Sequence, residues 1–307
     1  MEYVLRTFGL CKAYKNKLVL DKVDMNIEKG AVYGFVGENG SGKTTIIRLI
    51  TGLIHPTAGN FELFGVSSES DEIRTAKKRL GAIVETPSIY LNMSATENLK
   101  MQAEILGGIT EQKILDTLVE VGLGNLLEDK KKAGDFSLGM RQRLGLAMAL
   151  LGDPEFIILD EPMNGLDPAG IAQVRELILK LNRERGITFL ISSHILTELA
   201  LVATKYGIIS KGKIIKEVTE TELKNECRKF TEISVDDREK LIEVLSEFSY
   251  EIEPTATGVK IYDNIDLNGV LAKILESQIK ILSVNCTEVG IEDYYLSLVG
   301  GRGVKNA

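Results

Sequence analysis

Hydrophobic and polar positions follow two different periods along the first two-thirds of the chain. Short apolar runs at 31–36, 156–159 and 188–191 predict buried strands, because such strands are covered on both faces. Between the last two runs, apolar residues recur at helical spacing until Gly186, which predicts a crossover helix with a glycine cap. Strands that alternate with helices up to about Lys211 predict a mostly parallel sheet with helices packed around it.

A stretch from about residue 85 to residue 154 breaks this alternation. Its segments 95–106, 111–121 and 140–151 all have helical spacing of apolar residues, with no strand pattern between them. We therefore predict a helical subdomain, at about 86–154, inserted in an α/β core.

The character of the chain changes again near residue 215. Segments 229–235, 250–253, 258–262 and 279–284 read as strands, and segments 237–248 and 267–276 read as helices with one apolar face each. This β-α-β-β-α-β order is that of a ferredoxin-like domain. We expect a large α/β domain at 1–225 and a small α+β accessory domain at 226–307, with an unstructured tail at 300–303.

Composition limits the possible functions. The chain has 307 residues and is 44% hydrophobic, so it can bury a full core. Its formal net charge is −7, so it lacks the basic surface that nucleic-acid binding requires. No apolar run approaches the ~18 residues of a membrane span, and the first residues do not resemble a signal peptide. We expect a cytoplasmic protein that does not bind nucleic acid.

A glycine-rich segment after the first buried run carries the clearest chemical signal. The pattern G-x-x-x-x-G-K-[ST] is matched in full by Gly37, Glu38, Asn39, Gly40, Ser41, Gly42, Lys43 and Thr44. Its glycines let the backbone N–H groups surround a polyphosphate at a helix N-terminus. Lys43 is expected to reach the β- and γ-phosphates, and Thr44 to place its hydroxyl on Mg²⁺. Thr45, the next residue, is expected to contact the nucleotide as well.

Two carboxylates end the buried run at 156–159. Asp160 is expected to support Mg²⁺, and Glu161 to orient or deprotonate the water that attacks the γ-phosphate. A solvated strand end would explain such a pair if it stood alone. Together with the glycine-rich loop, it predicts a nucleotide-hydrolysing site.

A further segment, residues 136–143, places Ser137 just before a predicted helix. The N-terminus of that helix would be a second anion site. The sequence puts this site in the helical subdomain, apart from the glycine-rich loop.

These motifs, in this order, resemble the ATP-binding subunits of ABC transporters over about residues 3 to 225. The resemblance implies that Tyr14 stacks on adenine, that Ser137 and Gly139 form the signature contacting ATP, and that Asp167 belongs to the D-loop. It also implies that His194 is the switch histidine, acting in catalysis with Glu161 and Lys43. Fold, activity and cofactors would then be those of an ATPase using ATP and Mg²⁺.

Three positions depart from the usual family pattern. Leu138 and Met140 replace the common glycine and glutamine of the signature, and Glu85 stands where most members have a glutamine that senses Mg²⁺ and water. A carboxylate at Glu85 can still bind Mg²⁺. With the C-terminal segment 291–295, these features resemble the branch that handles bacitracin and lantibiotic-type peptides.

The resemblance implies an ATPase that powers a peptide-antibiotic exporter or self-protection system through a separate integral membrane permease. Two copies would form a homodimer at the inner face of the cell membrane, each site joining Lys43 of one copy to Ser137 of the other. A soluble ABC-type ATPase without a membrane partner is the alternative. A GTPase would need an N-K-x-D element, which Asn16-Lys17-Leu18-Val19 lacks, and a small-molecule kinase would not need the signature.

Overall fold

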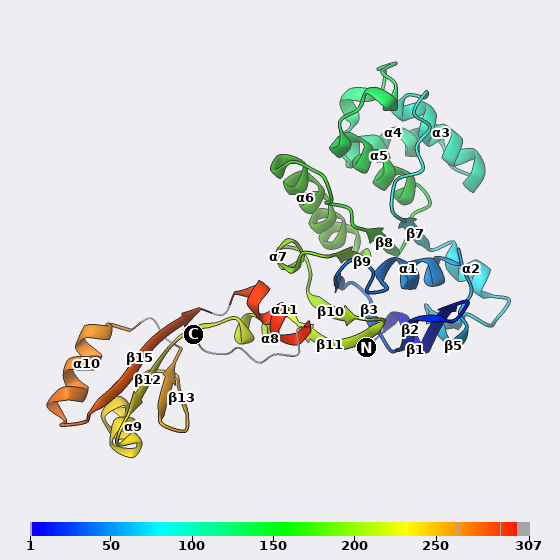
Figure 1. The fold of residues 1–307 in the computed structure, drawn as a ribbon. Coiled ribbons are helices and arrows are strands. Elements are labelled where there is room, and N and C mark those ends of the chain that lie inside the picture. The colour runs from blue at the N-terminus through cyan, green and yellow to red at the C-terminus, as the bar shows by residue number, and fades with distance from the viewer. Residues whose placement is uncertain (1, 263–264, 289, 300–307) are drawn as a thin grey trace. The chain divides into compact units, whose positions relative to one another are not determined.

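The structure is a computed structural model that describes residues 2–262, 265–288 and 290–299. It divides into two compact units, Met1–Glu220 and Thr221–Ala307, close to the boundary expected at 225. Figure 1 shows the elements of both units, which are described separately below. The tail expected at 300–303 lies outside the described residues.

An antiparallel sheet forms the start of the first unit. Its strands are β1 (Tyr3–Tyr14), β2 (Lys17–Val23), β3 (Asn26–Glu28), β5 (Ala58–Leu63) and β6 (Val66–Ser67). The order is β2-β1-β5-β6, with β3 paired to β1. The prediction of one mostly parallel sheet was therefore incomplete. Tyr14 pairs with Lys17, and so short a connection permits only antiparallel strands.

A second sheet carries the predicted buried runs. Its strands are β4 (Val32–Val36), β7 (Leu80–Ile83), β8 (Phe156–Asp160), β9 (Thr188–Ser193), β10 (Lys205–Ser210) and β11 (Lys213–Thr219). The order is β11-β10-β4-β9-β8-β7, and every pair except β10–β11 is parallel. The carboxyl ends of β4, β9 and β8 thus lie side by side, where open α/β sheets bind their ligands.

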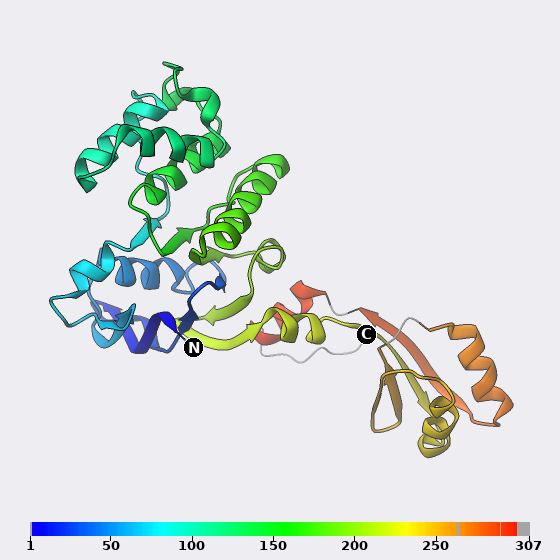
Figure 2. The ribbon, with the colours of Figure 1, turned by 180° about the vertical axis from the view of Figure 1, so that it is seen from behind.

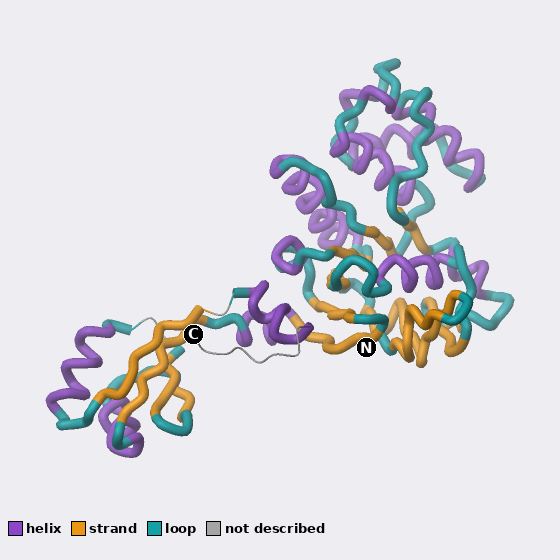
Figure 3. The backbone as a smooth tube through the Cα atoms, viewed as in Figure 1, coloured by secondary structure: helices purple, strands orange, loops and turns teal. Residues whose placement is uncertain are grey.

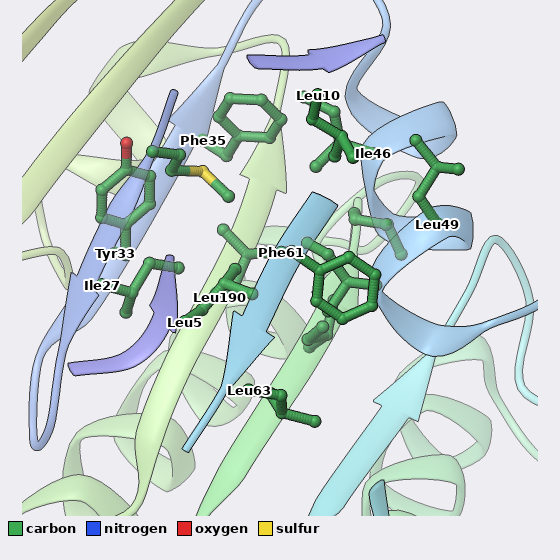
Figure 4. Close-up of a cluster of buried hydrophobic side chains, with 14 of the residues drawn as sticks. Leu5, Leu10, Ile27, Tyr33, Phe35, Ile46, Leu49, Phe61, Leu63 and Leu190 are labelled. Carbon is green, nitrogen blue, oxygen red and sulfur yellow. The ribbon is translucent and has the colours of Figure 1, made fainter. Parts of the chain in front are cut away.

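A hydrophobic cluster joins both sheets to helix α1 (Lys43–Thr51). Figure 4 shows Leu5 and Leu10 of β1 with Phe35 of β4, Leu190 of β9 and Ile46 of α1. Each of these side chains is at most 1% exposed. Burial of one such side chain stabilises the fold by roughly 1.5–3 kcal/mol, so this cluster holds α1 firmly against the sheet.

Three helices without intervening strands form the predicted helical subdomain, seen apart from the sheets in Figures 2 and 3. They are α3 (Ala95–Leu106), α4 (Glu111–Glu120) and α5 (Leu138–Leu150), with two short 3₁₀ turns at Gly124–Leu126 and Ala133–Asp135. Polar caps explain where they begin. Ser94 and Glu97 form a capping box on α3, and Thr110 caps α4.

The remaining helices of this unit are α2 (Ile73–Lys77), α6 (Pro168–Arg185) and α7 (Leu196–Leu199). The predicted crossover helix is α6, and Gly186 caps it in the left-handed conformation, as the sequence indicated. Among the described residues, no helix combines the length and apolar character needed to cross a membrane.

The second unit has the predicted ferredoxin-like order. Its elements are α8 (Glu220–Glu226), β12 (Lys229–Val235), α9 (Arg238–Ser246), β13 (Ile252–Pro254), β14 (Gly258–Ile261), α10 (Leu267–Glu276), β15 (Ile281–Glu288) and α11 (Ile291–Val299). The sheet is antiparallel throughout, in the order β13-β14-β12-β15. Apolar faces of α9 and α10 share one core with the sheet, and α11 adds a helix that the sequence analysis did not predict.

Candidate functional site

The loop between β4 and α1 has a backbone that only glycine adopts without strain. Gly40 and Gly42 have φ values of 80° and 116°. A Cβ atom on Gly42 would also lie 2.6 Å from Cδ2 of Leu20. These two positions let the chain turn tightly from β4 into α1, which begins at Lys43 without a side-chain cap.

Several polar groups of this loop have no protein partner. Ser41 Oγ is buried and makes no hydrogen bond within the described part of the chain. The hydrogen bonds of the described residues likewise use none of the N–H groups of Gly40, Gly42, Lys43 and Thr44. Unpaired donors at a helix N-terminus match the oxygens of a phosphate chain. The residues present therefore fit a bound polyphosphate.

Lys43 brings a buried positive charge to this loop. Its side chain is 6% exposed, and its Nζ donates a 2.5 Å hydrogen bond to the Gly37 carbonyl oxygen. The same Nζ lies 3.3 Å from Oε1 of Glu161. The predicted phosphate-binding cation and the predicted catalytic carboxylate thus meet in one place.

The end of β8 holds the acidic pair through a neighbour that the sequence analysis did not single out. Asp160 and Ser192 pair across the parallel strands β8 and β9. Ser192 Oγ donates to Oδ1 of Asp160 at 2.6 Å and accepts from the N–H of Glu161 at 2.9 Å. Asp160 is 2% exposed, so this hydroxyl orients a buried carboxylate. Ser192 lies two residues before His194, but nothing in the sequence marks it as a partner of Asp160.

Glu161 has a strained backbone and a histidine partner. Its φ is 50°, in the left-handed region that side chains rarely adopt. Nδ1 of His194 lies 2.8 Å from Oε2 of Glu161, while Oε1 faces Lys43. Both carboxylate oxygens are therefore fixed by charged or polar partners at the mouth of the loop.

A cleft of about 530 Å³ opens over these groups. Its lining combines the phosphate loop and Glu161 with four residues that no motif identified, Lys17, Leu18, Val19 and Lys211. Lys17, Leu18 and Lys211 come from hairpin turns or strand ends, where sequence pattern carries little information.

Tyr14 and Glu85 do not line this cleft. Tyr14 is 43% exposed, with Nζ of Lys12 5.1 Å from its ring centre, and it pairs in β1–β2 with Lys17, which does line the cleft. Glu85 follows β7 with a φ of 63°, and its carboxylate forms an ion pair with Arg48 of α1. Adenine stacking by Tyr14 and metal binding by Glu85 stay predictions.

The remaining predicted residues gather at a different place, the N-termini of α5 and α6. Ser137 Oγ accepts from the N–H of Met140 at 3.3 Å, and Oδ1 of Asp167 accepts from the N–H of Gly170 at 3.1 Å. A Cβ on Gly139 would lie 3.8 Å from Cα of Gly170, so the two helix ends are neighbours. None of the three predicted residues lines the cleft over Lys43.

The metal chemistry available at the cleft is limited and specific. Thr44 lines the cleft and carries one hydroxyl, and the buried carboxylate of Asp160 directly precedes Glu161, which also lines it. Among the described residues, no group of three or more His, Cys, Asp and Glu side chains is arranged around a metal position. Mg²⁺ keeps several waters and binds through one or two protein oxygens plus phosphate. The donor set therefore fits Mg²⁺ that arrives with a nucleotide.

This chain belongs to the family of ABC transporter ATP-binding proteins, which is a class of ATP-hydrolysing subunits. The ABC transporter family matches residues 20–164. The bacitracin transport ATP-binding protein BcrA of Bacillus licheniformis is 40% identical over 98% of this chain and 99% of its own length. The lantibiotic transport ATP-binding protein SrtF of Streptococcus pyogenes is 44% identical over 70% of this chain and 90% of its own length.

Solved structures agree with this assignment. The ADP conformation of an ATP-binding cassette of an ABC transporter, MJ1267, is 27% identical and superposes with a TM-score of 0.66, covering 73% of this chain and 94% of that one. The α/β fold of a P-loop NTPase core is thereby confirmed, as are ATP binding and hydrolysis as the activity of this family.

Proposed function

We propose that the cleft over Lys43 binds ATP with Mg²⁺ and hydrolyses it by the residues that the structure brings together there. Lys43 and the unpaired loop N–H groups would hold the phosphates, and Asp160 and Thr44 would hold the ion. Mg²⁺ would supply positive charge to the phosphate oxygens. Glu161, between Lys43 and His194, would accept the proton of the attacking water. This Lys43–Glu161–His194 arrangement is the observation that carries the proposal.

The position of Ser137 supports a two-copy assembly. The N-terminus of α5 could contact a phosphate, yet it does not line the cleft of its own chain. A two-fold dimer would place Ser137 and Gly139 of one copy, with Asp167, against the nucleotide held by Lys43 of the other. Glu161→Gln should then dimerise when ATP is added, because ATP is bound and not consumed.

We further propose that an integral membrane permease docks on the helical subdomain, at the inner face of the cell membrane. A cleft of about 380 Å³ lies where α3 and α5 meet β7, and its lining includes Leu53 and Leu106, which are 64% and 45% exposed. Ile105, next to it on α3, is 69% exposed. An exposed apolar surface of this kind is typical of a protein interface.

The transported substance that fits best is a peptide antibiotic, exported or kept out for self-protection. Support comes from two relatives whose names specify bacitracin and lantibiotic transport, one of them matched over nearly its full length. The departures at Glu85 and Leu138 are consistent with that branch.

Deletion and complementation in the source cell test this function. We expect loss of the protein to increase sensitivity to bacitracin or to a lantibiotic, and the wild-type gene to restore resistance. The Glu161→Gln variant should not restore it, whereas Glu184→Gln, an exposed change on α6, should. An integral membrane subunit should co-purify with the wild type. Unchanged sensitivity and no membrane subunit would instead favour the soluble ABC-type ATPase.

A further inference from the structure

The turn between β10 and β11 has an unusual residue at its first position. Ser210 pairs with Lys213, so Lys211 and Gly212 alone form the loop of the hairpin. Their φ values are 47° and 79°, as in a type I′ turn, which requires positive φ at both residues. Asn-Gly and Asp-Gly are the favoured pairs in such a turn, because these residues tolerate positive φ. Lysine is strained at positive φ.

This turn is fixed against the phosphate loop. The N–H of Gly212 donates to the Ser41 carbonyl oxygen at 2.9 Å, and the Gly212 carbonyl oxygen accepts from the N–H of Asp21 at 2.9 Å. A Cβ on Gly212 would lie 2.2 Å from the Val19 carbonyl oxygen. The backbone of Lys211 is thus held at the edge of the cleft over Lys43, and Lys211 is one of the residues that line this cleft.

The charge of Lys211 is not used inside the protein. Within the described residues its ammonium has no ion-pair partner, whereas Lys213, on the same hairpin, pairs with Asp21 at 2.9 Å and does not line the cleft. A strained residue with a free charge at a ligand cleft points to a role in ligand binding. The ligand must be anionic.

We propose that Lys211 is a polyphosphate-binding residue, which adds a further cation to the lining of the cleft, beside the phosphate loop. The inference rests on the proposed location of ATP over Lys43. Because the contact is between charges, it contributes more to the affinity for ATP than to the affinity for AMP, and this contribution decreases as the salt concentration rises.

Binding measurements with Lys211→Asn test this role. Calorimetry with ATP, ADP and AMP should show that this substitution lowers the affinity for ATP about fivefold at low salt. The loss of ATP affinity should be smaller at high salt, and the loss of AMP affinity should be smaller than that of ATP. Asparagine suits the turn, so the unfolding temperature without nucleotide should rise by about 2 °C. Lys211→Arg should keep the affinity, and Lys213→Asn, the matched control, should leave it unchanged.

Two results would overturn the proposal: wild-type ATP affinity in Lys211→Asn, or an equal loss for ATP and AMP. Lys43→Ala separates this failure from failure of the site itself. If Lys43→Ala loses ATP binding and Lys211→Asn does not, only the role of Lys211 is wrong. If Lys43→Ala still binds ATP normally, the proposed location of ATP is wrong.

Discussion

Two helices of the first unit begin at predicted anion sites, and they begin in different ways. Helix α1 starts after Gly42 without a side-chain cap, and within the described residues the N–H groups of Gly42, Lys43 and Thr44 have no protein partner. Helix α5 starts after Ser137, whose Oγ already accepts the N–H of Met140. We call the start of α1, which no side chain caps, the open end, and the start of α5, which Ser137 caps, the closed end.

This difference assigns the two ends to different steps. The start of α1 is preorganised and lies with Lys43 and Glu161 in one cleft, so a single chain can bind ATP there. In the proposed dimer, Ser137 would donate its hydroxyl to a phosphate oxygen of the nucleotide held by another copy, so ATP binding would precede assembly.

The largest expected effect separates chemistry from binding at the open end. Glu161→Gln removes the carboxylate between Lys43 and His194, so ATP turnover should fall about 1000-fold. Affinity for ATP should stay near the wild-type value, because Lys43 and the loop N–H groups are unchanged. Phosphate release and calorimetry measure the two quantities. Turnover close to that of wild type would exclude Glu161 as the base.

A matched pair of glycine substitutions tests the two ends directly. Gly42→Ala places a Cβ in a left-handed backbone 2.6 Å from Leu20, so the loop must deform. ATP affinity of the single chain should fall about 100-fold, as for the loss of one or two charge-assisted hydrogen bonds. Gly139→Ala meets only atoms at 3.8 Å and should leave that affinity unchanged. Equal effects of the two changes would contradict the difference between the ends.

Substitutions of Ser137 distinguish its cap from its proposed contact with ATP. Ser137→Ala removes the cap on α5 and should lower the free energy of unfolding by about 1 kcal/mol. Ser137→Asp keeps a cap, so its free energy of unfolding should be higher than that of Ser137→Ala. Its carboxylate would, however, repel the phosphates of ATP. Both should bind ATP as single chains and fail to dimerise in the Glu161→Gln background. Dimerisation of Ser137→Asp at wild-type ATP concentration would leave Ser137 only its structural role.

The smallest expected effect concerns the stability of the subdomain that carries α5. The Ser94 N–H, followed by Lys132, lowers the pKa of the Glu97 carboxyl from its ordinary 4.5. A lowered folded-state pKa stabilises the fold above the unfolded value and loses this contribution as pH falls through the folded value. Thermal unfolding should therefore show the unfolding temperature of wild type slightly above that of Glu97→Gln at pH 7, with the difference shrinking below the ordinary pKa of 4.5 and vanishing below the folded-state pKa. A difference that persists there would mean that the charge of Glu97 is not its source.

Much of the fold was predictable because its signals are local. Buried runs such as 156–159 define central strands, and Ser94 and Gly186 mark where helices begin and end. The antiparallel sheet was missed because half-buried strands such as β1 have irregular alternation and their pairing depends on distant partners like β5. Helix α11 was missed although its apolar residues Ile291, Tyr294, Tyr295 and Leu298 recur at helical spacing.

The residues of the site likewise divide into those that local sequence predicts and those that it does not. Lys43, Asp160 and Glu161 were predictable from fixed spacing, because a phosphate loop and a strand end each lie in one short segment. Ser192, Lys17 and Lys211 reach the site only through strand pairing and hairpin turns. Those contacts join residues far apart in the sequence, so no spacing along the chain reveals them.

In the proposed assembly, one ATP is held by the start of α1 from one copy and by the start of α5 from another. Mixing two variants in the Glu161→Gln background tests it most directly: Lys43→Ala, which should lose the open end, and Ser137→Asp, which should lose the closed one. Light scattering should show neither variant dimerising alone with ATP, and the mixture forming heterodimers through its one intact composite site. A mixture that stays monomeric, while Glu161→Gln alone dimerises, would contradict the account.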